Sequence, residues 1–162
     1  MTRPSSLDSP PDFGEITHVA LLVNEPQAAA EWYERVLGLK IVVSAPEACF
    51  LSLGRNHHDL ALIRANAPHS PGSVGLHHFA MTIRGGPTEL RRLHDRLVGL
   101  GVRIDRVSDH AVGWGVYFFD PDGNRLELFC NRENNSASEA QAVFIAEGAP
   151  SRTIPIERVG AS

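Results

Sequence analysis

The stretches "ITHVALLV" at residues 16–23 and "LHHFAMTI" at residues 76–83 decide how this chain is organised. Their alignment sets His18 against His78, and both stretches are rich in residues that favour strands. A segment that recurs after about 60 residues indicates an internal repeat, so the sequence is best understood as two copies of one unit.

A helix is predicted after each of the two strands, over residues 25–38 and 86–101. Asn24 is placed to cap the first helix, Pro26 lies in its first turn, and Pro87 has the same position in the second helix. Three β-like runs follow each helix: "LKIVVSA", "CFLSLG" and "DLALIRA" in the first copy, and "VRIDRVS", "WGVYFFD" and "RLELFCN" in the second. The sequence therefore predicts an α+β fold in which a β-α-β-β-β unit occurs twice in tandem.

The repeat also predicts the domain boundaries. One domain covers residues 15–132, with a first module at about 15–66 and a second at about 75–132. A unit of about 50 residues is too small to bury its own core well, so we expect the copies to pack together. Residues 1–14, rich in proline and serine, are expected to be a disordered tail, and residues 133–162 a C-terminal tail.

Composition excludes several classes of protein. The 162 residues are 43% hydrophobic and 21% charged, with a net charge of −4 and scattered basic residues, so we expect neither nucleic acid nor a membrane surface as partner. No apolar run reaches the roughly 20 residues of a membrane span, and the N-terminus lacks an apolar signal core. Cys49 and Cys130 make no disulfide framework, so a cytoplasmic location is expected.

Within the C-terminal tail, "AVFIA" (142–146) suits a short strand or a lid segment.

A carboxylate interrupts the last apolar strand, in "HAVGWGVYFFDPDGNRLELF" (110–129). Neighbours in a strand point to opposite faces, so Leu126 and Leu128 share one face and Glu127 takes the other. Burying an unpaired carboxylate is costly, and a divalent cation removes that cost. In the first copy the matching position is Ala61, which cannot bind a metal.

The repeated unit, its two histidine-containing openings and "VYFFDPDGNRLELF" resemble the vicinal oxygen chelate superfamily, which includes glyoxalase I, bleomycin resistance proteins and extradiol dioxygenases. The resemblance covers about residues 15–132 and is closest to the catalytic half of type I extradiol (catechol 2,3-) dioxygenases. The extradiol pattern is matched by His110, Val116-Tyr117, Asp120-Pro121 and Glu127. The resemblance implies a cupped mixed sheet around a metal site, with the helices outside.

By this resemblance the metal ligands are His18, His78 and Glu127. Two imidazoles and one carboxylate form the facial triad of non-heme Fe(II) oxygenases, and Mn(II) suits the same donors. Ala61 leaves vacant a position that resembles a fourth ligand in glyoxalase I, so places remain for a chelating substrate and O₂. His77 adjoins His78 and is expected to point away from the metal. Because the two are neighbours, the sequence leaves open which of them is the ligand.

Three further residues are expected to act on the substrate. His110 and His58 correspond to pocket histidines of the extradiol enzymes, where a histidine can transfer protons near neutral pH. Tyr117 corresponds to a hydrogen-bond donor to a substrate oxygen. Two alternatives stay open: His110 could bind substrate without transferring protons, and Tyr117 could simply fill the core. The turn at residues 120–123 is expected to have no role beyond turn formation.

These observations predict a metal-dependent extradiol dioxygenase that cleaves a small catechol-like substrate with O₂. The alternatives are a glyoxalase-like isomerase or thiol transferase on the same fold, and a metal-free drug-binding resistance protein. The chain has one pair of modules where typical catechol 2,3-dioxygenases have an additional pair. It therefore resembles the small members of the superfamily, and we expect a homodimer, which would also cover open sheet edges.

Overall fold

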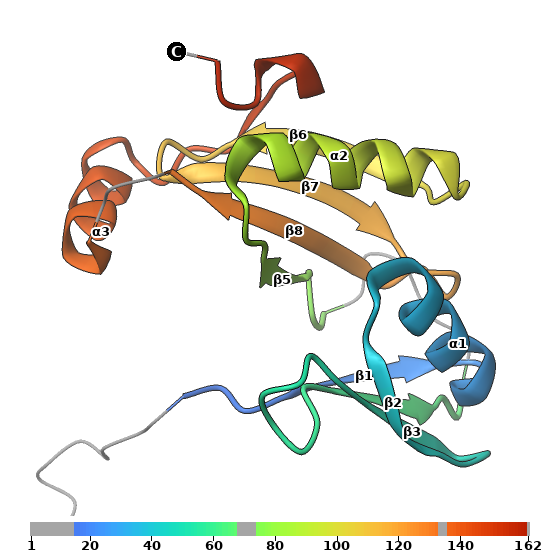
Figure 1. Ribbon diagram of the computed structural model, residues 1–162. Helices are drawn as coiled ribbons and strands as arrows, with labels where there is room; N and C mark the ends of the chain where they lie inside the picture. The colour runs from blue at the N-terminus through green and yellow to red at the C-terminus, as the bar shows by residue number, and fades with distance from the viewer. Residues whose placement is uncertain (1–14, 68–73, 133–135, 162) are drawn as a thin grey trace, which may run out of the picture.

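The computed structural model describes residues 15–67, 74–132 and 136–161 (Figure 1). The first module consists of β1 (Val19–Val23), α1 (Pro26–Leu37), β2 (Lys40–Ser44), β3 (Ala48–Ser52) and β4 (Leu60–Arg64). The second consists of β5 (Phe79–Thr82), α2 (Gly86–Gly99), β6 (Ile104–Asp109), β7 (Gly113–Phe119) and β8 (Arg125–Asn131). The order confirms the α+β class and the repeated β-α-β-β-β unit. The expected N-terminal tail, residues 1–14, lies outside the described residues.

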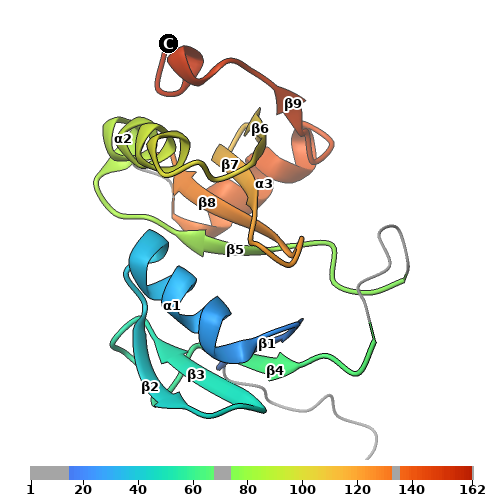
Figure 2. The same cartoon turned by 90° about the vertical axis from the view of Figure 1, so that its right-hand side faces the viewer.

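Each module forms its own sheet. The strand order is β1-β4-β3-β2 in the first module and β5-β8-β7-β6-β9 in the second, where β9 (Arg152–Thr153) is a short addition from the C-terminal part. Helix α1 lies between its own sheet and the second module (Figure 2). Helix α2 packs on the second sheet against β7 and β8. Within one chain the two sheets are separate and do not close around a common centre, and β1 and β5 are edge strands.

Strand register confirms the match between the two modules. In the parallel pair of β1 and β4, Ala20 lies opposite Ala61. In the equivalent pair of β5 and β8, Ala80 lies opposite Glu127. Glu127 therefore occupies the place that Ala61 holds in the first copy, as the sequence repeat predicts.

Apolar spacing explains how α1 packs. Ala29, Ala30, Tyr33 and Val36 recur at helical intervals, and all four are buried. The prediction that Asn24 caps this helix is wrong. The N-cap is Glu25, which makes no side-chain capping bond. The backbone N–H of Asn24 instead donates to Asp122 Oδ1 at 3.1 Å, and its side-chain amide contacts the same oxygen, because the second module's turn lies beside this end of α1.

A buried polar contact joins the two modules. Tyr33 on α1 donates through its hydroxyl to Asp120 Oδ2 at 2.9 Å, and the Asn124 side chain donates to the same carboxylate oxygen at 2.9 Å. Burial raises the pKa of Asp120 above its usual value and also raises the pKa of Tyr33. Asp120 therefore does more than shape the turn, because it also accepts a hydrogen bond across the module boundary.

The C-terminal part folds back on the second module. The "AVFIA" segment lies in a helix, α3 (Ala137–Ala146), whose N-terminus has a capping box of Ser136 and Glu139. Strand β9 then pairs with β6, and η1 (Ile156–Arg158) leads to Val159, which is fully buried. No helix in the described ranges has both the length and the apolar character that a membrane crossing requires.

Candidate metal centre

Glu127 is the buried centre of a polar cluster in the second module. It lies in mid-β8 between Leu126 and Leu128, which face the core, and it is 4% exposed. Its Oε2 is 3.2 Å from His78 Nε2, and its Oε1 is 3.6 Å from His110 Nε2. Oε1 is buried and has no hydrogen-bond partner among the described residues. A buried, incompletely paired carboxylate beside two imidazoles suits a divalent cation.

His110 and Tyr117 form a connected pair beside this carboxylate. The Nδ1–H of His110 donates to the backbone oxygen of Pro150 at 2.9 Å, so in the neutral ring Nε2 is unprotonated. The Tyr117 hydroxyl can then donate to that Nε2, which lies 3.1 Å away. Interaction with Glu127 raises the pKa of His110, and burial together with the Glu127 charge raises the pKa of Tyr117 to about 12.

His78 and His77 approach different partners through Nε2, although their Nδ1 atoms lie 2.7 Å apart. His78 Nε2 approaches Glu127, whereas Nε2 of His77 lies 3.0 Å from Nη1 of Arg125. Burial lowers the pKa of His78, against an opposing effect of the Glu127 charge. The neutral imidazole that results is the form that binds metals.

The first module carries a separate histidine cluster. The His18 ring lies 4.5 Å from the His58 ring between centroids, and Phe50 packs edge-on against His58. Burial and the neighbouring His57 lower the pKa of His58. No contact joins His18 to Glu127 in the described ranges, where no group of three His, Cys, Asp or Glu side chains could hold a metal ion. One chain thus brings together His78, Glu127, His110 and Tyr117, and places His18 and His58 in a second cluster.

Two residues that sequence reasoning missed shape the centre. Gly115 on β7 lies beneath the Glu127 carboxylate, so that a side chain there would overlap Oε1. Glycine inside a strand is a known signal of such close approach, and β7 has two, Gly113 and Gly115. Arg106 on β6 pairs in register with Tyr117, and its guanidinium carbon lies 5.0 Å from the centre of the Tyr117 ring.

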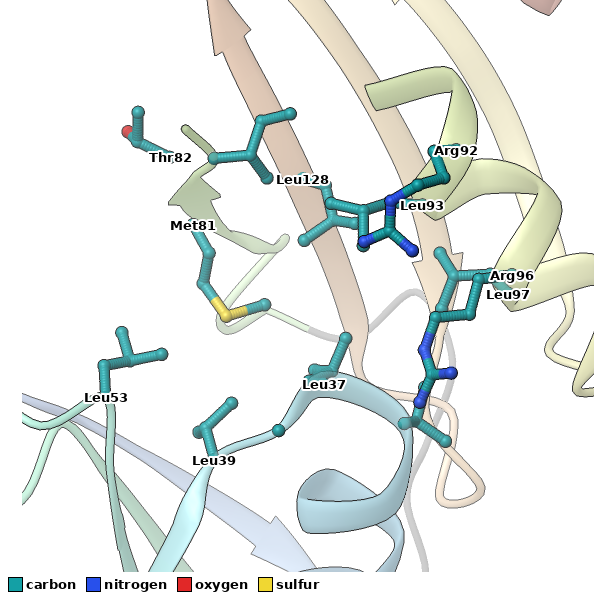
Figure 3. A pocket seen from close by; sticks show the side chains of 13 residues that line it. Leu37, Leu39, Leu53, Met81, Thr82, Arg92, Leu93, Arg96, Leu97 and Leu128 are labelled. Atoms are coloured by element: carbon teal, nitrogen blue, oxygen red, sulfur yellow. The ribbon is translucent and has the colours of Figure 1, made fainter. Parts of the chain in front are cut away.

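A cavity of about 430 Å³ lies between the modules, away from these clusters (Figure 3). Its walls come mainly from the end of α1, strand β5 and helix α2. Leu37, Leu39, Met81 and Leu97 give it a largely apolar lining. None of the predicted site residues lines it, so the cavity is separate from the candidate metal centre.

Comparison with known proteins identifies the family. The model of the glyoxalase/bleomycin resistance protein/dioxygenase superfamily matches residues 15–128. The chain belongs to this superfamily. Its fold is similar to that of a solved lactoylglutathione lyase from Agrobacterium tumefaciens, with 26% identity, a TM-score of 0.58, and coverage of 75% of this chain and 95% of that chain.

Curated relatives fall into more than one reaction class. Two biphenyl-2,3-diol 1,2-dioxygenases of Rhodococcus globerulus, numbered 2 and 3, are 32% and 35% identical to this chain; each match covers 70% of the chain. The matched region is 61% of the length of either dioxygenase. The metallothiol transferase FosB of Lysinibacillus sphaericus (strain C3-41) is 30% identical over 70% of this chain and 79% of its own length.

Proposed function

We propose that this protein is a metal-dependent extradiol-type dioxygenase that cleaves a catechol-like aromatic ring with O₂. The observation that carries the proposal is the buried Glu127 carboxylate, which lies between the imidazoles of His78 and His110 with Oε1 unbonded in the described structure. Identity of 32% and 35% to two diol dioxygenases supports this reaction class.

The ligands in this proposal are His78 and Glu127 of one chain and His18 of a second copy. Two imidazoles and a carboxylate suit Fe(II), and Mn(II) nearly as well. When bound, the metal supplies a Lewis acid and a redox centre at which an aromatic diol and O₂ can react. The chain's own contribution is a donor set held on a rigid strand, with Ala61 leaving the fourth ligand position vacant.

A homodimer would bring the two half-sites together. Strands β1 and β5 each have an unpaired edge in the described sheets, and His18 and His78 immediately precede them. Ile16, Leu22 and Leu76 lie on or next to these strands with more than half of their surface exposed. Pairing β1 of one copy with β5 of the other would cover both edges and bring His18 towards Glu127.

Proton transfer is assigned to His110, with Tyr117 as a hydrogen-bond donor to the substrate. The bond from His110 Nδ1–H to Pro150 leaves Nε2 unprotonated, so Nε2 can exchange its hydrogen bond from Tyr117 for one from a diol hydroxyl, accept that proton and return it later. The raised pKa of Tyr117 keeps its hydroxyl protonated at neutral pH, so it remains a donor. His58, neutral by its lowered pKa and adjacent to His18, is the second proposed acid–base group.

The first rival is a glyoxalase-like isomerase or a thiol transferase, which the match to FosB supports. The second is a metal-free binding protein. The buried carboxylate with two imidazoles disfavours the binding protein, because such a protein has no need of this donor set. Ala61 disfavours the four-ligand arrangement that the resemblance attributes to glyoxalase I.

Two measurements test the proposal. Purified wild-type protein should hold about one Fe or Mn per chain, and His78→Ala should lose it whereas the matched control His77→Ala should keep it. Anaerobic addition of a panel of catechols to the Fe(II) protein should give a bound complex, and O₂ should then produce a yellow ring-opened product. Conversion of a glutathione hemithioacetal, or thiol addition to fosfomycin, without O₂ consumption would contradict the proposal.

A further inference from the structure

Two guanidinium groups flank Tyr117 on the side of the second sheet that carries Glu127. The guanidinium carbons of Arg106 and Arg125 lie 5.0 and 4.6 Å from the centre of the Tyr117 ring. Tyr117 is opposite Arg106 on β6 and opposite Glu127 on β8. The three side chains therefore cross the sheet in one row, with the carboxylate at one end and Arg106 at the other.

The second guanidinium, Arg125, has a carboxylate partner. It forms an ion pair with Asp105 and also contacts His77 Nε2 at 3.0 Å. Arg132, at the end of β8, is likewise paired with Asp109 at 2.9 Å. The charges of these two arginines are thus balanced by the protein's own acidic side chains.

Arg106 has no such partner. In the described parts of the chain no carboxylate forms an ion pair with it; its Nη2 donates to the neutral Ser151 Oγ at 3.0 Å, and the guanidinium also interacts with the Tyr117 hydroxyl. Its Nε is buried without a hydrogen-bond partner, as Nε is in Arg125 and Arg132, so what distinguishes Arg106 is that it has no carboxylate partner. The hydroxyl of Ser108, two residues further along the same strand, is also buried without a partner. A half-buried guanidinium with no carboxylate partner of its own is suited to receive an anion from a ligand.

We propose that the substrate of this site is a vicinal diol that also carries a carboxylate, and that Arg106 binds this carboxylate. The inference rests on the proposed function, because the diol is assigned to the Glu127 end of the row. The planar guanidinium fork matches a carboxylate, and Ser108 offers a further donor beside it. The substrate would lie over Tyr117 with its diol towards β8 and its carboxylate towards β6.

The test uses pairs of probes that differ in one charge. The first pair is protocatechuate and the catechol that carries a methyl group in place of its carboxylate. In the second pair the carboxylate or the methyl group is attached to the ring carbon next to the diol. Dissociation constants are measured anaerobically by calorimetry on the full-length, metal-loaded protein, for wild type, Arg106→Met and Arg92→Met. Arg92 is the matched control, because it lies on α2 and is paired with Glu89.

Wild type and the Arg92→Met control should bind the carboxylated member of at least one pair about ten- to hundred-fold more tightly than the neutral member. Arg106→Met should lose this preference and bind the neutral member as wild type does. Arg106→Lys should keep part of the preference, because it retains the charge but not the fork.

Three results would overturn the inference. Equal affinity for both members of each pair in wild type and Arg106→Met would exclude a carboxylate subsite, while diol binding would leave the proposed function intact. Equal weakening of charged and neutral probes in Arg106→Met would make Arg106 a mere support for Tyr117. If no diol binds the metal-loaded protein, or if binding is the same in Glu127→Ala, the proposed function fails and this inference falls with it.

Discussion

Gly115 and Glu127 are in close contact across two strands of the second sheet. The Glu127 carboxylate lies over the Cα of Gly115, and a Cβ at that position would overlap Oε1. Gly115 has an ordinary negative φ, so its role is to make room and not to adopt an unusual backbone conformation. The position of the central carboxylate therefore depends on the absence of a side chain on the neighbouring strand.

Gly115→Ala should displace this carboxylate and weaken metal binding. Disturbing a group that orients a ligand typically costs about ten- to hundred-fold in metal affinity, and we expect a loss of that size. Gly99→Ala is the control, because a Cβ there meets no atom within 4 Å. Metal titration of both variants checks the prediction, and unaltered affinity in Gly115→Ala would show that the carboxylate does not hold the metal from this position.

Substitution of His110 or His58 by alanine should leave metal content unchanged and slow ring cleavage by about a hundred- to ten-thousand-fold, the usual range for loss of a general acid or base. His94→Ala, on α2, should leave the rate as it is in wild type. Metal analysis and oxygen-uptake rates on the same preparations separate the two roles. Loss of metal from either His110→Ala or His58→Ala would mean that the proposed ligand set is wrong.

Asp120 should make the protein less stable as the pH rises. Its pKa in the folded protein lies above the usual value, so the unfolded chain loses this proton first and the folded state is favoured at low pH. The free energy of unfolding of wild type, relative to Asp120→Asn, should therefore fall as pH rises through the folded pKa. Urea unfolding from about pH 3 to 7 measures this difference. Asp95→Asn controls for surface charge, and a relative stability that grows with pH would contradict the assignment.

Val159 should contribute to the stability of the second module although it lies in the C-terminal part. It is fully buried, so Val159→Ala should lower the free energy of unfolding by about 1 to 3 kcal/mol. Val98→Ala, at a half-exposed position on α2, is the control and should have a much smaller effect. Equal effects of the two substitutions in denaturant unfolding would show that the C-terminal part does not pack on the module in solution.

The sequence predicted those features that follow from strand periodicity and from the repeat. Strand alternation predicted that Glu127 lies on the other face of the sheet from Leu126 and Leu128. The repeat matched Glu127 to Ala61, as the strand register confirms. The close approach of Glu127 to Gly115 could have been predicted, because glycine between bulky residues of a strand signals such an approach. These features follow from short patterns of neighbouring residues, so they can be deduced from the sequence.

The remaining features depend on how distant segments meet. The separation of His18 from Glu127 in one chain follows from the packing of the modules, in which Tyr33 bonds to Asp120, and no local pattern encodes that packing. Arg106 reaches the face of Tyr117 after a register irregularity between Ile104 and Arg106, which simple alternation does not predict.

Co-expression of His18→Ala with Glu127→Ala tests most directly whether two chains together form a metal-dependent dioxygenase site. In a mixed dimer, one site would receive both substitutions and the other would receive His18 and Glu127 intact. Each variant alone should be inactive, whereas the mixture should regain catechol-dependent O₂ uptake at about a quarter of the wild-type level if chains pair at random. No recovery in a verified mixed dimer would contradict the shared site, and substantial O₂ uptake by Glu127→Ala alone would contradict the proposed metal centre itself.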